Sequence, residues 1–168
     1  ALASIYRDHP DLKIELFSGL SRRLIDHVAG GVLDLALVSE PDHADEDLTL
    51  THIWKEPYQL IRSVNEHLSD PLELLMQRPY IWFDRRTWLS RKIERYFLEH
   101  NIVVQNAMEV DSIEAVEALV SHNLGISVIP KRALTGEATN LVSTLFAEGA
   151  LERNVVLVNR KASPRHIF

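Results

Sequence analysis

The sequence has no cysteine among its 168 residues. This absence excludes disulfide bridges, thiolate metal sites and a cysteine nucleophile. No apolar run approaches the roughly 20 residues that a membrane-spanning helix needs, and the first residues lack the basic and then apolar layout of a secretory signal. These absences predict a cytoplasmic protein that does not contact a membrane.

A surplus of basic residues is also missing. Eighteen Lys and Arg are interspersed among twenty-four Asp and Glu, which gives a formal net charge of −6. The sequence has no basic stripe of the kind that neutralises nucleic-acid phosphates. The chain by itself should therefore bind DNA poorly.

The motifs of common catalytic sites do not occur in the sequence. The eight histidines are scattered, and no two of them form the i,i+4 pair of a zinc-binding helix. A Gly-x-Ser-x-Gly elbow, a Walker loop and a Gly-x-Gly-x-x-Gly loop are all absent. We therefore expect no catalytic residue, no metal site and no cofactor, and a protein that is not an enzyme.

The first part of the chain has the pattern of a strand, a helix and a second strand. Apolar side chains alternate over 12–17, and an apolar stripe at helical spacing follows over 20–30. Residues 33–38 are mostly apolar on both faces, which is typical of a strand covered by helices on both sides of a parallel sheet. This order predicts a βαβ unit whose loops at 18–21 and 39–40 lie along one edge.

The rest of the chain contains a second series of strands and helices. An alternating segment over 48–54 is followed by Glu56-Pro57, which we interpret as a break where the chain crosses into a second lobe. Two such series predict two α/β lobes hinged about a cleft, and the cleft is the default ligand site. The later elements are predicted as strands over 58–64, 80–83, 102–110, 125–129, 141–146 and 155–159, and as helices over 71–77, 88–100 and 113–122.

Several stretches match one known family, in order along nearly the whole chain: Pro10-x-Leu12-x-Ile14-x-Leu16, Gly19-x-Ser21-x-x-Leu24, Gly31-x-Leu33-Asp34-Leu35-Ala36-Leu37, Glu56-Pro57, Pro79-Tyr80-Ile81, Glu109-Val110-Asp111-Ser112 and Leu124-Gly125-Ile126-x-x-x-Pro130. The sequence resembles the effector-binding domains of LysR-type bacterial transcription regulators. It departs from the family pattern at His67-Leu68-Ser69, where His-Pro-Leu is usual, and at Asn123, where glycine is usual. Asparagine tolerates the left-handed conformation of such a turn better than most residues.

The resemblance implies a periplasmic-binding-protein-like α/β fold in two lobes, each a mixed sheet flanked by helices, with a ligand cleft between the lobes. Residues 1–56 and 148–168 would form the first lobe, and residues 57–147 the second. The implied function is the sensing of a small-molecule effector in that cleft. DNA would be bound only by an N-terminal winged helix-turn-helix domain that this chain does not contain. Family members are usually tetramers when full length, and their effector-binding domains pair head to tail as homodimers.

Hydroxyl groups at predicted helix starts are the first candidate effector contacts. The free N–H groups and the dipole of a first helical turn favour an anion such as a carboxylate. Ser21 and Ser112 hold such positions, although each serine is also an ordinary helix cap. Further effector contacts are predicted near the edge of the cleft, from the ends of the predicted strands and from the family resemblance. They are Ser18, Gly19, Ser39, Asp84, Asp111, Gly125 and Ile126.

A second group of candidates closes a predicted buried strand, where the family commonly places ligand contacts. Trp82 and Phe83 are either effector contacts or core side chains. Arg85 or Arg86 would hold a carboxylate effector bidentately, or both would be solvated loop residues.

Two predicted helices, 20–30 and 88–100, each carry a charged flank beside an apolar stripe. A two-fold pair that docks the first lobe of one subunit on the second lobe of the other would bring these flanks together. The predicted dimer-interface residues are Arg22 and Arg23 on one helix and Glu94 and Glu99 on the other; simple solvation of these charges is the alternative.

Two other classes of protein remain open from the sequence. A solute-binding protein of a transport system would share the fold and the cleft. An enzyme built on a two-lobed α/β scaffold would also share the fold, because fold does not determine function.

Overall fold

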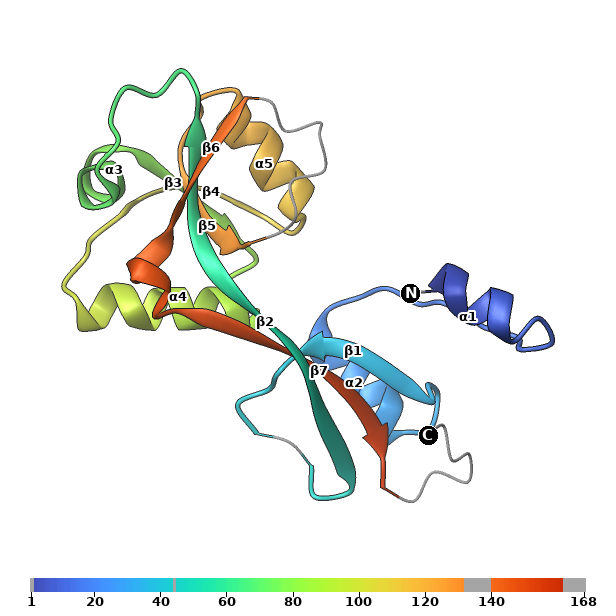
Figure 1. The fold of residues 1–168 in the computed structure, drawn as a ribbon. Helices are drawn as coiled ribbons and strands as arrows, with labels where there is room; N and C mark the ends of the chain where they lie inside the picture. Colours follow the sequence, from blue (N-terminus) through green and yellow to red (C-terminus); the bar gives the residue numbers. More distant parts are fainter. Residues whose placement is uncertain (1, 44, 132–139, 162–168) are drawn as a thin grey trace.

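The computed structural model describes residues 2–43, 45–131 and 140–161. Two bodies of helices and strands are joined by two long antiparallel strands, β2 (Leu48–Ser63) and β7 (Glu152–Arg160), which cross between them (Figure 1). The chain therefore has the two-lobed α/β architecture that was predicted. A short helix, α1 (Leu2–Asp8), lies to one side of the first lobe. Residues 162–168, which were assigned to the first lobe, lie outside the described residues.

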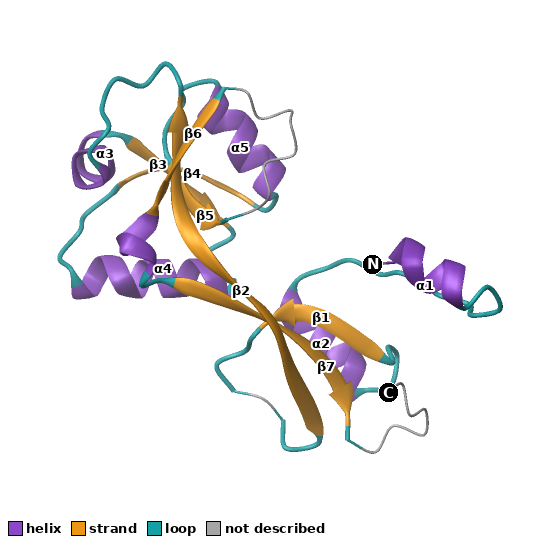
Figure 2. Ribbon diagram, in the orientation of Figure 1, coloured by secondary structure: helices purple, strands orange, loops and turns teal. Residues whose placement is uncertain are grey.

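The first lobe is a three-stranded antiparallel sheet with one helix on it (Figure 2). Its strand order is β1 (Leu35–Ser39), β7, β2, and α2 (Ser21–Ala29) packs against β1 and β7. Helix α2 ends where Gly31 adopts a φ of 76°, a conformation that glycine takes without strain. The core of the lobe lies between the helix and the sheet and consists of Val28, Ala36, Val38, Leu48, Val156 and Val158.

The predicted parallel βαβ unit of the first lobe is wrong. Residues 12–17 form no strand, and Leu16 is 77% exposed; β1 pairs antiparallel with β7 and buries only one of its faces. Alternation shows which face of a segment is suited to burial, but a strand also requires a neighbouring strand to supply its hydrogen bonds, and no neighbour among the described strands lies beside 12–17. The pattern of that segment therefore predicted a strand that this structure does not contain.

The second lobe contains a genuine βαβ unit. β3 (Pro79–Phe83) and β4 (Gln105–Val110) pair in parallel, and α4 (Trp88–Glu99) connects them. β5 (Ser127–Pro130) and β6 (Leu141–Leu145) each pair antiparallel with the second half of β2. The remaining elements of this lobe are α3 (Pro71–Gln77), α5 (Ile113–Ser121) and a 3₁₀ turn, η1 (Phe146–Gly149).

The core of the second lobe is built around aromatic rings. Trp82 packs edge to face on Tyr80 and Phe97, with ring centroids 4.7 and 5.9 Å apart, and Phe146 of η1 closes the cluster against Phe97. A second apolar cluster lies under α5. In it Val116 and Val120 of the helix pack on one isoleucine from each of the strands β2, β3 and β5, which are Ile61, Ile81 and Ile129.

Strand β2 runs from one lobe to the other without interruption, so the break predicted at Glu56-Pro57 is wrong. Pro57 has no N–H, but its carbonyl accepts a hydrogen bond from Lys131 at 2.7 Å, and the next amide, that of Tyr58, donates to the Leu151 carbonyl at 2.9 Å. The partner of β2 changes at this point: Pro57 pairs with β7, and Tyr58 pairs with β5. The division of the lobes at 56/57 and 147/148 stays a prediction.

An ion pair between a buried carboxylate and a partly exposed arginine should make the stability of the second lobe depend on pH. Arg78 donates to both carboxylate oxygens of Glu66, with Nη2–Oε1 at 2.9 Å, and this lowers the pKa of Glu66 from 4.5 to about 2. A lowered pKa contributes stability above the unfolded value, and that stability is lost as pH falls from about 5 towards 2. The Arg78 side chain is 38% exposed, so water screens the pair. Glu66→Gln should therefore cost about 2 kcal/mol at pH 7, less than a fully buried pair would.

Urea unfolding of the wild type and the Glu66→Gln variant at pH 7 and pH 3 checks this prediction. The difference in the free energy of unfolding between the two proteins should be smaller at pH 3 than at pH 7. A difference that stayed constant with pH would show that the Glu66 charge does not contribute.

Candidate functional site

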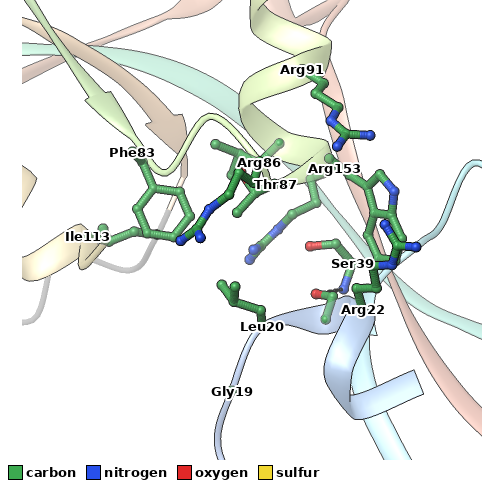
Figure 3. A pocket seen from close by; sticks show the side chains of 13 residues that line it. Gly19, Leu20, Arg22, Ser39, Phe83, Arg86, Thr87, Arg91, Ile113 and Arg153 are labelled. Carbon is green, nitrogen blue, oxygen red and sulfur yellow. Dashed lines mark hydrogen bonds between the residues drawn. The ribbon is translucent and has the colours of Figure 1, made fainter. Parts of the chain in front are cut away.

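A pocket of about 520 Å³ lies between the two lobes, and side chains from both line it (Figure 3). This volume is within the range of small-molecule sites. The first lobe contributes the loop before α2, the first turn of α2 and the end of β1, through Gly19, Leu20, Ser21, Arg22 and Ser39.

Ser21 and Ser39 are joined across the wall of the first lobe. The Ser39 N–H donates to Ser21 Oγ at 3.2 Å. The two loops are therefore in contact, although the parallel βαβ unit from which their place along one sheet edge was predicted is not formed. Leu20 is the N-cap of α2, and no side chain caps this helix. Ser21 therefore does not act as a cap. Its hydroxyl accepts from Ser39, and no described residue accepts its hydroxyl hydrogen, which is thus available to a ligand.

The second lobe contributes the end of β3 and the first turn of α4. Thr87 caps α4: its hydroxyl accepts from Ser90 N–H at 3.2 Å and donates to the Asp84 carbonyl at 2.8 Å. The first turns of α2 and α4 thus both border the pocket, and such turns have N–H groups without intrahelical acceptors. The residues of this wall are Phe83, Arg86, Thr87, Trp88, Leu89, Arg91 and Ile113.

Asp84 positions one of the pocket arginines. Its side chain is buried, and it accepts from Arg86 through Nε at 2.9 Å, through Nη2 at 3.0 Å and through the backbone N–H at 3.0 Å. These hydrogen bonds hold the pKa of Asp84 below its usual value of 3.8. Because the carboxylate is already occupied by Arg86, Asp84 orients the guanidinium and is not free to bind a ligand.

Arg153 enters the pocket from the crossing strands. It lies on β7 opposite Glu56 of β2, and the two side chains form an ion pair. Its Nε atom is buried and has no hydrogen-bond partner among the described residues. A ligand in the pocket would therefore lie beside the segment that connects the lobes.

The charged side chains that line the pocket are all positive. Arg22, Arg86, Arg91 and Arg153 belong to the lining, and no Asp or Glu of the described residues does. Arginine stays protonated in proteins. The arrangement is suited to an anion.

Five of the predicted effector contacts line this pocket: Gly19, Ser21, Ser39, Phe83 and Arg86, the second of the two arginine candidates. The structure places the others elsewhere. Trp82 lies in the aromatic core, where its indole N–H donates to Asn106 Oδ1 at 2.8 Å. Ser112 caps α5 through Ala115 N–H at 3.2 Å, the alternative that the sequence left open.

Arg85 also lies outside the pocket lining. It stacks on the Trp82 ring at 4.9 Å and pairs with Glu94 of its own chain. Its guanidinium is therefore already in use. Of the remaining predicted contacts, Ser18 and Asp111 are exposed loop residues, and Gly125 and Ile126 lie where the backbone meets β3.

The sequence did not single out several lining residues. Leu20, Thr87, Trp88, Leu89 and Arg91 lie in or just before the first turns of α2 and α4, so the predicted helix starts were a usable signal for them. Ile113 begins α5. Arg153 had no such signal, because it comes from a return strand far along the chain.

The four predicted interface residues have different surroundings. Arg22 lines the pocket, and Glu94 pairs with Arg85 inside the chain. Arg23 and Glu99 are exposed. Interface formation by these side chains stays a prediction.

Among the described residues, none of the helices has the length and apolar character needed to cross a bilayer. In the same part of the chain, no cluster of three or more His, Asp or Glu side chains is arranged to hold a metal ion.

The family model of the LysR substrate binding domain matches residues 1–166. The chain belongs to the LysR substrate-binding domain family. A curated relative, the HTH-type transcriptional activator CmpR of Synechocystis, is 25% identical over 167 residues, which cover 96% of this chain and 55% of that protein. The chain thus spans about half the length of this LysR relative.

Solved structures of LysR domains have the same fold. The effector binding domain of QuiR in complex with shikimate aligns with a TM-score of 0.82 at 23% identity, over 96% of this chain and 79% of that one. The CcmR regulatory domain of Synechocystis PCC6803, in complex with 2-PG, aligns with a TM-score of 0.86 at 19% identity, over 99% of this chain and 82% of that one. Both likenesses concern the two-lobed LysR fold.

Proposed function

We propose that this chain is the effector-sensing part of a LysR-type transcription regulator, and that its effector binds in the pocket between the lobes. The observation that carries this proposal is that the pocket is lined from both lobes and from the crossing strand β7. QuiR and CcmR, which share the fold, were solved with shikimate and with 2-PG. A carboxylate is the effector class that the arginines and the free hydroxyl hydrogen of Ser21 suit.

An effector held by both lobes would change the angle between them. A ligand shifts a conformational equilibrium only by the difference in its affinity for the two states. A ligand that touches Ser21 in one lobe and Thr87 in the other gains both contacts only when the lobes approach, so it favours the closed arrangement. In the full-length protein this change would alter oligomer geometry and DNA binding. The same pocket in a transport protein or an enzyme is the less supported alternative, because the relatives are regulators.

Ser21→Ala should lower effector affinity about tenfold, since it removes one neutral donor and leaves the pocket shape intact. The effector is first found by a thermal-shift screen of metabolites, because a ligand of the folded state raises the midpoint. Calorimetry then compares Ser21→Ala with Ser18→Ala, a serine that does not line the pocket. Equal affinity in the wild type and Ser21→Ala would contradict the proposed site.

We further propose that the domain forms a homodimer, tetrameric when full length, and that DNA is contacted only through the separate helix-turn-helix domain. Arg23 and Glu99 are the interface candidates that are exposed and outside the pocket. Arg23→Glu should loosen the dimer, and Glu99→Lys should partly restore it, because rim charges set orientation more than affinity. Sedimentation of the three proteins measures this. A dimer indifferent to both reversals would rule out this interface.

A further inference from the structure

Two of the four pocket arginines have a carboxylate partner and two have none among the described residues. Arg86 is held by Asp84, and Arg153 by Glu56. Neither Arg22 nor Arg91 forms an ion pair within the described residues, and both line the pocket. After the two internal pairs are balanced, the pocket lining retains two positive charges.

These two charges come from opposite lobes. Arg22 is the second residue of α2 in the first lobe, and Arg91 lies one turn into α4 in the second. Figure 3 shows Arg91 extending from the α4 side of the opening, and Arg22 from the side of α2. Bringing the lobes together around an empty or neutral pocket would move like charges closer, which costs electrostatic energy. An anion between them removes that cost.

The size of the pocket limits the size of the ligand, and its charge limits the charge of the ligand. A volume of about 520 Å³ takes a small metabolite together with its close contacts. A singly charged ligand would leave one of the two guanidiniums unbalanced in the closed pocket. A ligand with two negative charges would balance both.

From this charge count we propose that the effector is a small dianion, with its negative charges divided between Arg22 of the first lobe and Arg91 of the second. The proposal rests on the proposed function and specifies its ligand class. Two kinds of metabolite carry this chemistry, a dicarboxylate and a phosphate monoester, and the phosphate carries about 1.5 to 2 negative charges near pH 7.

Paired probes test the charge requirement. Succinate is compared with butyrate, which has the same carbon chain and one carboxylate, and glycerol 3-phosphate is compared with glycerol. The expected result is that at least one dianion raises the unfolding midpoint and binds about tenfold or more tightly than its partner, with an affinity that falls as salt is added. The succinate and phosphate arms show which kind of dianion is accepted.

Charge-neutralising variants test the residues. Arg22→Gln and Arg91→Gln should each lower the affinity for the dianion about tenfold, and should reduce its advantage over the monoanion. Arg95→Gln and Arg7→Gln are the controls, because each removes the same charge at an exposed position outside the pocket lining, Arg95 from α4 itself and Arg7 from α1. Both controls should bind the dianion as the wild type does.

Three outcomes would overturn the inference. The controls could weaken binding as much as the pocket variants do, which would indicate only non-specific attraction. A second such outcome is that neither dianion binds at roughly 20 mM, a concentration well above the millimolar dissociation constant expected of two charge-assisted contacts. Lastly, a neutral or singly charged metabolite could bind tightly and lose affinity in Ser21→Ala. That result would reject the dianion and leave the proposed function standing.

Discussion

Trp82→Ala should lower the free energy of unfolding by about 4 kcal/mol, the cost of removing a large aromatic side chain from a packed core. Trp82 is 4% exposed, packs against Tyr80 and Phe97, and donates a hydrogen bond to Asn106. The variant would leave a cavity and remove the hydrogen bond to Asn106. Urea denaturation of the purified protein measures the loss.

Trp54→Ala is the matched control for this prediction. Trp54 is 44% exposed and its indole N–H also donates to a side chain, Glu56, so it differs from Trp82 mainly in burial. Trp54→Ala should lower the free energy of unfolding clearly less than Trp82→Ala does. Trp82→Phe should bind the effector with wild-type affinity, because the pocket lining does not include Trp82. A selective loss of effector binding in Trp82→Phe would restore Trp82 as an effector contact.

Gly125→Ala should destabilise the protein by about 3 kcal/mol through overpacking. A Cβ at this position would lie 2.4 Å from the Pro79 carbonyl oxygen and 3.2 Å from Ile81 Cγ1. The backbone cannot move aside easily, since Ile126 N–H donates to Pro79 and Ile81 N–H donates to Ile126, both at 2.9 Å. The glycine is thus required by the close approach of the segment before β5 to β3.

Gly19→Ala provides the comparison, because a Cβ there would lie 3.8 Å from the nearest side-chain atom, that of Leu24. This variant should change the unfolding midpoint little. Equal stability of Gly125→Ala and the wild type would show that the approach at Pro79 is looser than the structure describes.

Helices were predicted more accurately than strand pairing. The predicted helix 88–100 is observed as α4 over Trp88–Glu99, and 113–122 as α5 over Ile113–Ser121. Their signals are local: apolar spacing, a capping hydroxyl at Thr87 or Ser112, and a stop at Asn123, which has a φ of 60°. Such signals depend on residues a few positions apart.

Strand partners could not be predicted in the same way. Residues 12–17 have the alternation of a strand and no neighbour among the described strands, and β2 continues through a proline that looked like a break. A strand is stabilised by residues distant in sequence, such as the pairing of Glu56 with Arg153. The lateral order of strands is therefore not contained in local patterns.

The sequence alone determined the two-lobed α/β organisation, the family and the helix starts at the pocket, because these depend on local spacing and on ordered motifs. Only the tertiary structure decided which charges are free. Four arginines line the pocket, and two of them have carboxylate partners. Arg86 pairs with Asp84, two residues away in the sequence, and Arg153 pairs with Glu56, ninety-seven residues away. An ion pair depends on distance in space, which a linear pattern does not contain. The two arginines without an ion pair among the described residues, and with them the expected charge of the effector, follow from the fold.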